Sequence, residues 1–418
     1  MVSLRGSFVK FLYMVFCGVS SHDFCMIALH DFYVVSSHNF CVVSLHCFFV
    51  CEQKEVVYSM DQEKQSRVLT GMEQLKVTQM MITDPNALFY LTGKWIHPGE
   101  RFLGLLLSKD HKPVLIVNEL FSFPEDIGAV KQYFSDTDDL APVWRKWINK
   151  DEKLGIDKTM PSGFLLKMME CGAASGYVLG SAAVDGARAV KNAAEQEKMR
   201  RSSRINDAAM QEFKKLIHKG VTELEVAEQM LGIYKSLGAE AYSFDPIVAF
   251  GANAADGHHM PDNTVLKEGD CVLLDVGCIA DSYCSDMTRT YFYKREPDAL
   301  QKEIYQLVRR ANEEAEAMLK PGLPLCNIDK KARDIITEGG YGPMFTHRLG
   351  HFIGIEDHEA GDVSLANKNL TKAGNIFSIE PGIYVTGKAG VRIEDLVLIT
   401  ENGAEVLNHA SKDIEVLG

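Results

Sequence analysis

The sequence lacks the basic excess, the paired cysteines and the long apolar run that mark three common classes of protein. Its 44 lysines and arginines are outnumbered by 57 aspartates and glutamates, which gives a net charge of −13. Nucleic acids and anionic membranes both require a basic face, so we expect neither as the main partner. The ten cysteines contain no C-x-x-C pair, which argues against a disulfide framework and favours a reducing, cytoplasmic compartment.

What the N-terminus does contain is a repeat with a period of eight, between residues 20 and 51. Histidine returns at every eighth position, at His22, His30, His38 and His46. Such a tract can bind metal, although its spacing matches no zinc pattern. A signal or membrane segment needs a longer apolar stretch than the repeat allows. The third interpretation, which we favour, is that residues 1–59 are a non-structural extension, translated from repetitive DNA, and that the functional protein starts at Met60.

The rest of the chain is long enough for two domains. Residues 60–190 mix helical and strand patterns and predict a smaller N-terminal α/β domain. We expect strands at 75–84, within 102–118, where a turn falls at 109–112, and at 152–157. We expect helices at 125–134, 141–150 and 161–172. This domain groups neither acids nor histidines and contains no glycine-rich phosphate loop, so we assign it no chemistry.

Residues 191–418 predict an α+β domain in which two helices followed by strands occur twice. Each of the first two helices starts with a capping box, an Asn or Thr followed three residues later by Glu. The four helices are predicted between Asn192 and Lys219, between Thr222 and Gly238, at 298–319 and at 327–338. The repeated order indicates an internal duplication, and each half carries acids inside a strand hairpin.

The first hairpin contains two carboxylates that are separated by eleven positions. Asp275 ends an apolar run, where an ionised carboxylate is costly unless something compensates its charge. If the hairpin turns at residues 280–281, Asp275 faces Asp286 across the two strands. Opposed residues have Cβ atoms roughly 4.5–5.5 Å apart, so this hairpin offers one pair of facing acids.

The second hairpin repeats this arrangement. With a turn at Gly387, Glu380 faces Glu394. Four carboxylates in one core repel each other unless cations lie between them, and two divalent metal ions about 3.5–4 Å apart would be held by such a set. His351 adds a neutral nitrogen ligand. Any one of these acids alone would be a solvated strand-end residue, but two matching pairs favour a metal centre.

These motifs resemble the pita-bread metallopeptidases, which include methionine aminopeptidase, aminopeptidase P and prolidase. The resemblance covers residues 60–418. DPNALFYLTG is similar to the N-terminal domain of the proline-specific branch, and HRLGHFIGIEDHE, SIEPGIYV and VRIEDLV are similar to the catalytic domain. The resemblance implies a duplicated pita-bread catalytic domain behind a creatinase-type α/β domain. The metal ligands that it implies are Asp275, Asp286, His351, Glu380 and Glu394.

The resemblance also implies roles for the residues around the metal ions. Glu380 would act as general base and acid. His258 and His358 would be catalytic, binding the substrate and the developing oxyanion. His347 would shape the pocket for the residue after the scissile bond, and Arg392 would either orient an acid or hold a substrate carboxylate.

We therefore expect a dinuclear metal peptidase that hydrolyses the Xaa-Pro bond at the N-terminus of small peptides through a hydroxide bridging two ions. The ligand set suits manganese, with cobalt, zinc or iron as alternatives. The resemblance implies a homodimer. Arg348 and Phe352 stand where many relatives carry glycine, and we expect both to narrow the substrate pocket.

Two questions stay open at this point. Aminopeptidase P and Xaa-Pro dipeptidase activities differ in how far the cleft extends beyond the second residue, which the sequence does not decide. From a different class, an inert scaffold or binding protein on the same fold is the alternative. The complete ligand set argues against that alternative, and also against creatinase-like hydrolysis, which needs no metal.

Overall fold

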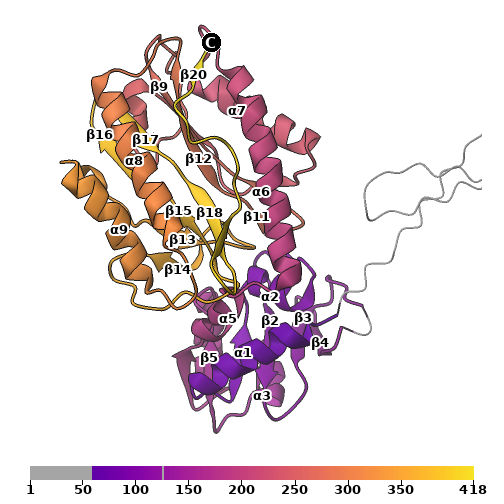
Figure 1. The fold of residues 1–418 in the computed structure, drawn as a ribbon. Coiled ribbons are helices and arrows are strands. Elements are labelled where there is room, and N and C mark those ends of the chain that lie inside the picture. The colour runs from indigo at the N-terminus through magenta and orange to yellow at the C-terminus, as the bar shows by residue number, and fades with distance from the viewer. Residues whose placement is uncertain (1–58, 125–126) are drawn as a thin grey trace, which may run out of the picture. The chain divides into compact units, whose positions relative to one another are not determined.

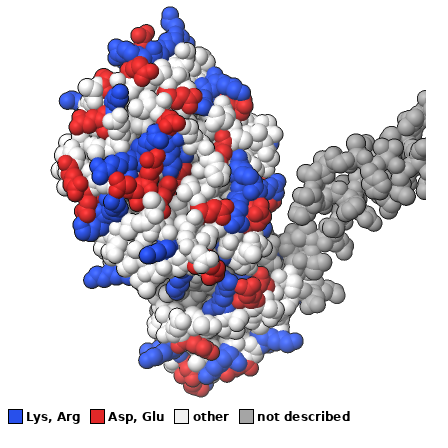
Figure 2. All heavy atoms as spheres, in the orientation of Figure 1, with Lys and Arg blue, Asp and Glu red and all other residues white. Residues whose placement is uncertain are grey.

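The structure is a computed structural model that describes residues 59–124 and 127–418, so the eight-residue repeat lies outside it. Met60 is buried, and its backbone N–H donates to the carbonyl of Ile127 at 2.9 Å. None of the helices in the two described ranges is long and apolar enough to cross a membrane. On the face drawn in Figure 2, acidic and basic side chains are interspersed.

The N-terminal part is a six-stranded sheet in the order β4-β3-β2-β1-β5-β6, with helices packed around it. Its elements are α1 (Gln62–Gln74), β1 (Gln79–Ile82), α2 (Pro85–Thr92), β2 (Leu103–Ser108), β3 (Val114–Asn118), β4 (Val130–Phe134), α3 (Leu140–Trp147), β5 (Lys153–Ile156), α4 (Ser162–Glu170), β6 (Gly176–Leu179) and α5 (Ser181–Arg188). The helix predicted over 125–134 is wrong. Residues 130–134 pair in parallel with β3, because a neighbouring strand satisfies their backbone and their valine, tyrosine and phenylalanine suit a strand.

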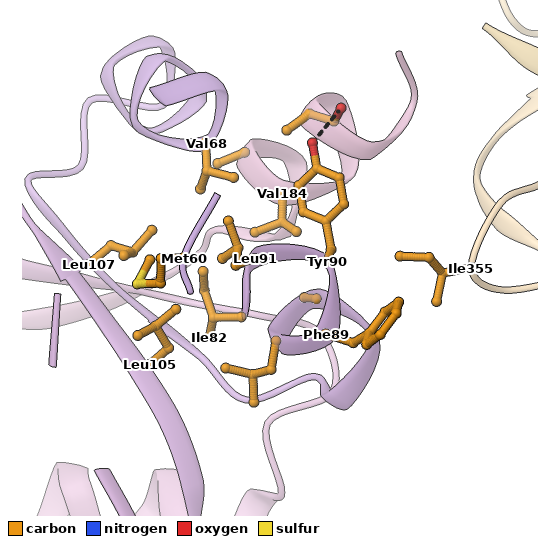
Figure 3. Packing of buried hydrophobic residues seen from close by; sticks show 14 of the residues in the cluster. Met60, Val68, Ile82, Phe89, Tyr90, Leu91, Leu105, Leu107, Val184 and Ile355 are labelled. Atoms are coloured by element: carbon orange, nitrogen blue, oxygen red, sulfur yellow. Dashed lines mark hydrogen bonds between the residues drawn. The ribbon is translucent and has the colours of Figure 1, made fainter. Parts of the chain in front are cut away.

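One hydrophobic core joins this sheet to the rest of the described chain. Figure 3 shows Ile82 of β1 and Leu91 of α2 in this core, with Ile355 approaching from a different segment. The Tyr90 hydroxyl donates to the carbonyl of Ala187 at 3.2 Å, the dashed line in Figure 3. The segment around residue 355 is therefore packed against the N-terminal part.

The remaining part repeats two helices followed by strands, as the sequence predicts. Its elements are α6 (Ala193–Phe213), α7 (Glu223–Ser236), β7 (Ala241–Tyr242), β8 (Ile247–Phe250), β9 (Cys271–Val276), β10 (Cys278–Ala280), β11 (Tyr283–Cys284), β12 (Met287–Tyr293), α8 (Ala299–Ala317), α9 (Leu325–Glu338), β13 (Gly350–Phe352), β14 (Glu359–Val363), β15 (Ile376–Ile379), β16 (Gly382–Val385), β17 (Ala389–Arg392), β18 (Asp395–Ile399), β19 (Ala404–Val406) and β20 (Val416–Leu417). Both predicted capping boxes are present, at the starts of α6 and α7. Figure 1 shows α6 and α7 (magenta) on one side of the strands and α8 and α9 (orange) on the other.

The register of the first hairpin differs from the prediction. The turn falls at Asp281 and Ser282, which both have a positive φ, of 51° and 64°. Two consecutive left-handed residues form a tight turn that matches the twist of its strands. As a result Asp275 faces Thr288, and the prediction that it faces Asp286 was wrong. Asp286 lies two positions before Thr288, which places both on the same side of the chain.

The register of the second hairpin is as predicted. Gly387 has a φ of 71°, Gly382 pairs with Arg392, and Ile379 pairs with Asp395. Both pairings are centred on Gly387, so the turn was placed correctly. Residues 380 and 394 lie where the β16–β17 ladder gives way to the β15–β18 ladder.

Candidate metal centre and active site

A cavity of about 1080 Å³ collects the predicted site residues from both halves of the duplicated domain. Its lining includes all nine of them, Asp275, Asp286, His351, Glu380, Glu394, His258, His347, His358 and Arg392. They come from strands β9, β13 and β17 and from the segments beside them. Residues more than a hundred positions apart in sequence therefore line the same cavity.

His351 points an unprotonated nitrogen at two acids. Its Nδ1 faces the carbonyl oxygen of Phe352 at 3.3 Å, and a carbonyl can only accept, so the ring proton sits on Nδ1. Its Nε2 lies 3.4 Å from Asp286 Oδ2 and 3.6 Å from Glu380 Oε1. Burial, with the nearby His358, lowers the pKa of His351 to about 3. A neutral nitrogen lone pair thus converges with two carboxylate oxygens.

Among the described residues, several carboxylates in the cavity keep one buried oxygen without a hydrogen-bond partner. One oxygen each of Asp275, Asp286 and Glu394 is buried without a hydrogen-bond partner in the described part of the chain. Burial and the charge of Glu394 raise the pKa of Asp286 well above its ordinary value. Buried polar atoms without partners are rare in folded proteins, so these carboxylate oxygens indicate a site for a cation.

The donor set fits a divalent metal ion. Asp286, His351 and Glu394 present ligand atoms that all lie within 4.8 Å of one another. Burial, followed by repulsion from Glu380, raises the pKa of Glu394 well above its ordinary value. Oxygen and imidazole ligands together suit manganese, iron, cobalt or zinc.

Arg392 holds two of the acids in place. Its Nη2 donates to Asp275 Oδ2 at 2.5 Å, and its Nε donates to Thr288 Oγ1 at 3.0 Å. The Thr288 hydroxyl in turn donates to Glu394 Oε2 at 2.7 Å. Nothing in the sequence singles out Thr288, and only the observed register places it opposite Asp275.

His347 is oriented by a chain of hydrogen bonds. Its Nδ1 lies 2.7 Å from the carbonyl oxygen of Arg348, so that nitrogen carries the proton. Its Nε2 accepts from the Tyr384 hydroxyl at 2.9 Å, and that hydroxyl accepts from Arg392 Nη1 at 2.8 Å. Burial and the charge of Arg392 lower the pKa of His347 to about 4. Its Nδ1 lies 3.9 Å from Glu380 Oε2.

The other two predicted histidines lie on the open side of the cavity. His358 is exposed, and its ring lies against that of His351, with centroids 3.8 Å apart and planes tilted by 39°. Burial of part of the ring and the charge of Arg348 lower the pKa of His358. His258 is also exposed, and its backbone N–H donates to Asp256 Oδ1 at 3.1 Å. Both are placed to meet a molecule that enters the cavity.

Asp357 is a further carboxylate in the cavity that sequence reasoning missed. One of its oxygens is buried without a partner among the described residues, and the other lies 3.4 Å from His358 Nε2. Burial, then repulsion from Asp275, raises its pKa to about 7. The available signal was its position, directly before His358 in IEDHE.

Arg348 and Phe352, which stand where many relatives carry glycine, lie in different environments. Phe352 is buried in the core, with its ring 5.5 Å from that of Phe377. The expectation that Phe352 narrows the pocket was therefore wrong, because alternation along β13 turns its side chain away from His351. Arg348 does line the cavity.

A second group of metal-ligand type, Glu223, His259 and Asp262, lies outside the cavity wall. Glu223 is fully buried and its oxygens are satisfied: it accepts from the Phe250 N–H at 2.7 Å and from the Asp262 N–H at 3.2 Å, and it lies 2.6 Å from His259 Nε2. This group anchors the loop that carries His258.

Buried ion pairs connect the N-terminal part to the segment that carries His358. Arg188 Nη2 lies 2.6 Å from Glu359 Oε1, and Lys191 Nζ lies 2.9 Å from Glu359 Oε2. Arg188 also reaches Asp84 Oδ2 at 3.6 Å. Although burial opposes it, the charges of Lys191 and Arg188 lower the pKa of Glu359 to about 2. The position of His358 is thus coupled to the contact between the two parts.

Comparisons with known proteins match both parts of the chain. The model of the creatinase/prolidase N-terminal domain matches residues 64–190, and that of metallopeptidase family M24 matches residues 197–401. An uncharacterized peptidase of Staphylococcus aureus is 38% identical over 360 residues, which is 84% of this chain and 99% of that relative.

Two solved structures are similar over most of the chain. A prolidase from Pyrococcus horikoshii has a TM-score of 0.78 at 30% identity, over 84% of this chain and all 100% of that one. An X-Pro aminopeptidase from Thermotoga maritima has a TM-score of 0.71 at 29% identity, over 83% of this chain and 100% of that one.

Proposed function

Since the chain belongs to metallopeptidase family M24, and is therefore a metallo-exopeptidase with a pita-bread fold, we propose that it hydrolyses the bond between an N-terminal residue and a proline in the second position. The observation that carries the proposal is that His351 Nε2 approaches Asp286 Oδ2 and Glu380 Oε1. Beside them lie buried oxygens of Asp275, Asp286 and Glu394 that have no hydrogen-bond partner in the described part of the chain. The proline preference is supported by the match to the creatinase/prolidase domain and by similarity to a prolidase and an X-Pro aminopeptidase.

We propose that the site holds two divalent cations, with manganese as the first candidate. The ligands that we assign are Asp275, Asp286, His351, Glu380 and Glu394. When bound, two such ions supply an activated water molecule and a charge that polarises the scissile carbonyl. The choice of manganese is supported by an oxygen-rich set with a single imidazole.

Glu380 is assigned as the proton carrier of the reaction. Burial, with the charge of Asp275, raises its pKa to about 8, which suits a group that must both take and return a proton near neutral pH. His347 lies beside the same carboxylate, with 3.9 Å between its Nδ1 and Oε2, while its Nδ1–H donates to the carbonyl of Arg348. We assign His347 to the pocket wall beside the leaving residue.

His258 and His358 are assigned to the substrate. Both are exposed on the cavity wall, and an imidazole N–H can donate to the carbonyl oxygen as negative charge develops there. Arg392 is assigned the orienting role, because its donors are already taken by Asp275, Thr288, Tyr384 and the carbonyl of Gly257.

Three further assignments follow from the same reasoning. We propose domain boundaries at residues 60–190 and 191–418, a homodimer that size-exclusion chromatography with light scattering can test, and a cytoplasmic location. The location is supported by the described cysteines, which are all free thiols, Cys171, Cys271, Cys278, Cys284 and Cys326.

The test is hydrolysis of Xaa-Pro and Xaa-Pro-Yaa, with Xaa-Ala as the comparison substrate, by protein loaded with manganese. We expect cleavage of the proline substrates and loss of turnover on chelation. Asp286→Ala and Glu394→Ala should abolish turnover and metal binding together, whereas Glu401→Ala, at an exposed acid remote from the cavity, should change neither. An active protein without metal would contradict the proposal. A folded, metal-loaded protein that cleaves none of the substrates would favour the inert scaffold.

A further inference from the structure

Arg348 is a cation in the wall of the cavity that the proposed chemistry does not use. The residue is exposed and lines the cavity beside His347. Its hydrogen bond is a long one, from Nη2 to His358 Nδ1 at 3.4 Å, and it forms no ion pair with an acid in the described ranges. Most of its five donors therefore face the open space.

Arg348 lies beside the centre of the site. After burial, its charge is the next cause of the lowered pKa of His358. The ring of His358, which Arg348 contacts, lies against that of His351 with 3.8 Å between the centroids. Arg348 therefore stands one side chain away from the proposed metal ligands, within reach of a small substrate bound there.

An acid stands at the other end of the same imidazole ring. Asp357 Oδ2 lies 3.4 Å from His358 Nε2, while Arg348 Nη2 approaches Nδ1. Asp357 and Arg348 thus flank the same imidazole, and Arg348 is the cation on this exposed part of the wall. A short peptide with both ends free carries a carboxylate, which such a cation attracts.

The second arginine of the described cavity wall cannot serve the carboxylate. Arg392 is 3% exposed, and its nitrogens donate to Asp275, Thr288, Tyr384 and the Gly257 carbonyl. Arg348 forms only the long hydrogen bond to His358 among the described residues. A guanidinium binds a carboxylate through two parallel hydrogen bonds, and only Arg348 has a free edge for it.

We propose that Arg348 binds the free carboxylate of the residue that follows the scissile bond, and that it thereby selects dipeptides over longer peptides. This inference rests on the proposed Xaa-Pro peptidase function and deepens it. In a dipeptide the proline carries the carboxylate. In a longer peptide the same position holds an uncharged amide, which leaves the guanidinium without its partner.

The experiment compares an Xaa-Pro dipeptide with its C-terminal amide, Xaa-Pro-NH2, on the manganese-loaded enzyme. We expect kcat/KM to favour the free acid in the wild type, and this preference to fall roughly tenfold or more in Arg348→Ala, the scale of one hydrogen-bonded charge pair. Most of the change should be in KM. Arg348→Lys should keep part of the preference, because it retains the charge without the paired geometry.

The matched control is Arg310→Ala, which removes the same charge from a 56% exposed arginine on α8, outside the cavity. It should keep the wild-type preference. An Arg348→Ala enzyme that loses activity equally on acid and amide, or that keeps its preference for the acid, overturns the inference. Melting temperatures of both variants verify that they fold, as expected at two exposed positions.

Calorimetric binding separates failure of this inference from failure of the proposed function. If the wild type hydrolyses neither substrate, the peptidase proposal fails, and binding of the same dipeptide and amide still tests Arg348. Tighter binding of the acid, lost in Arg348→Ala, supports the carboxylate site. Equal binding of acid and amide by the wild type, or no binding of either, overturns it.

Discussion

The buried acids should make the metal-free protein less stable as pH rises. Glu380 has an ordinary pKa of 4.5 that burial and Asp275 raise to about 8. Between these two values the folded chain holds a proton that the unfolded chain has released, so the folded state binds more protons and its stability falls with increasing pH. At about 1.4 kcal/mol per pKa unit, the full effect is about 4–5 kcal/mol.

Glu380→Gln isolates this effect. The glutamine keeps an oxygen for the Ser378 hydroxyl, which lies 3.2 Å from Glu380 Oε1, but it cannot ionise. Neighbouring acids share the available protons, so we expect the metal-free wild type to lose at least about 2 kcal/mol more than the variant between pH 5 and pH 8. The assay is urea unfolding in the presence of a chelator at both pH values.

The control is Glu401→Gln, which neutralises an exposed acid and should follow the wild type. Manganese at a thousand times its dissociation constant should restore about 4 kcal/mol to the wild type at pH 8, and less to Glu380→Gln. Equal pH slopes for wild type and Glu380→Gln without metal would refute the reasoning, since ionisation of this acid would then cost nothing in the folded state.

Three other predictions concern the surroundings of the site. His358→Ala should keep its full metal content and lower kcat roughly 10²–10³-fold, the scale of one lost oxyanion donor. Elemental analysis measures the metal and steady-state kinetics measure kcat. A fully metal-loaded variant with unchanged kcat would contradict the assigned role. Arg188→Met leaves Glu359 buried without its closest cation, so we expect a loss of about 3–5 kcal/mol in unfolding free energy and a lower kcat, neither of which Arg310→Met should show. A chain that starts at Met60, whose side chain is already part of the core, should match the melting temperature and activity of the full chain, and a clear deficit in either contradicts this.

Local rules in the sequence determined much of the second domain. The capping boxes that begin α6 and α7 depend on residues three positions apart, so they are visible without tertiary contacts. The turn at Gly387 is equally local, because glycine adopts the required positive φ without strain. From that turn alone, the opposition of positions 380 and 394 follows.

Tertiary structure decided the features that depend on distant partners. Residues 130–134 are a strand because β3 lies beside them, and Asp275 faces Thr288 because a left-handed pair at 281–282 sets the turn. Neither Asp nor Ser is the residue that such a conformation favours most, so the sequence pointed elsewhere.

The same holds for the charges in the cavity. The sequence shows two arginines near the acids, Arg348 and Arg392, and gives no means of telling which one is free. In the fold, Arg392 is enclosed by four partners while Arg348 faces the cavity. A charged side chain either binds other groups of the protein or stays accessible to a ligand. Which of the two holds depends on burial and on hydrogen-bond partners, and both are properties of the packed chain.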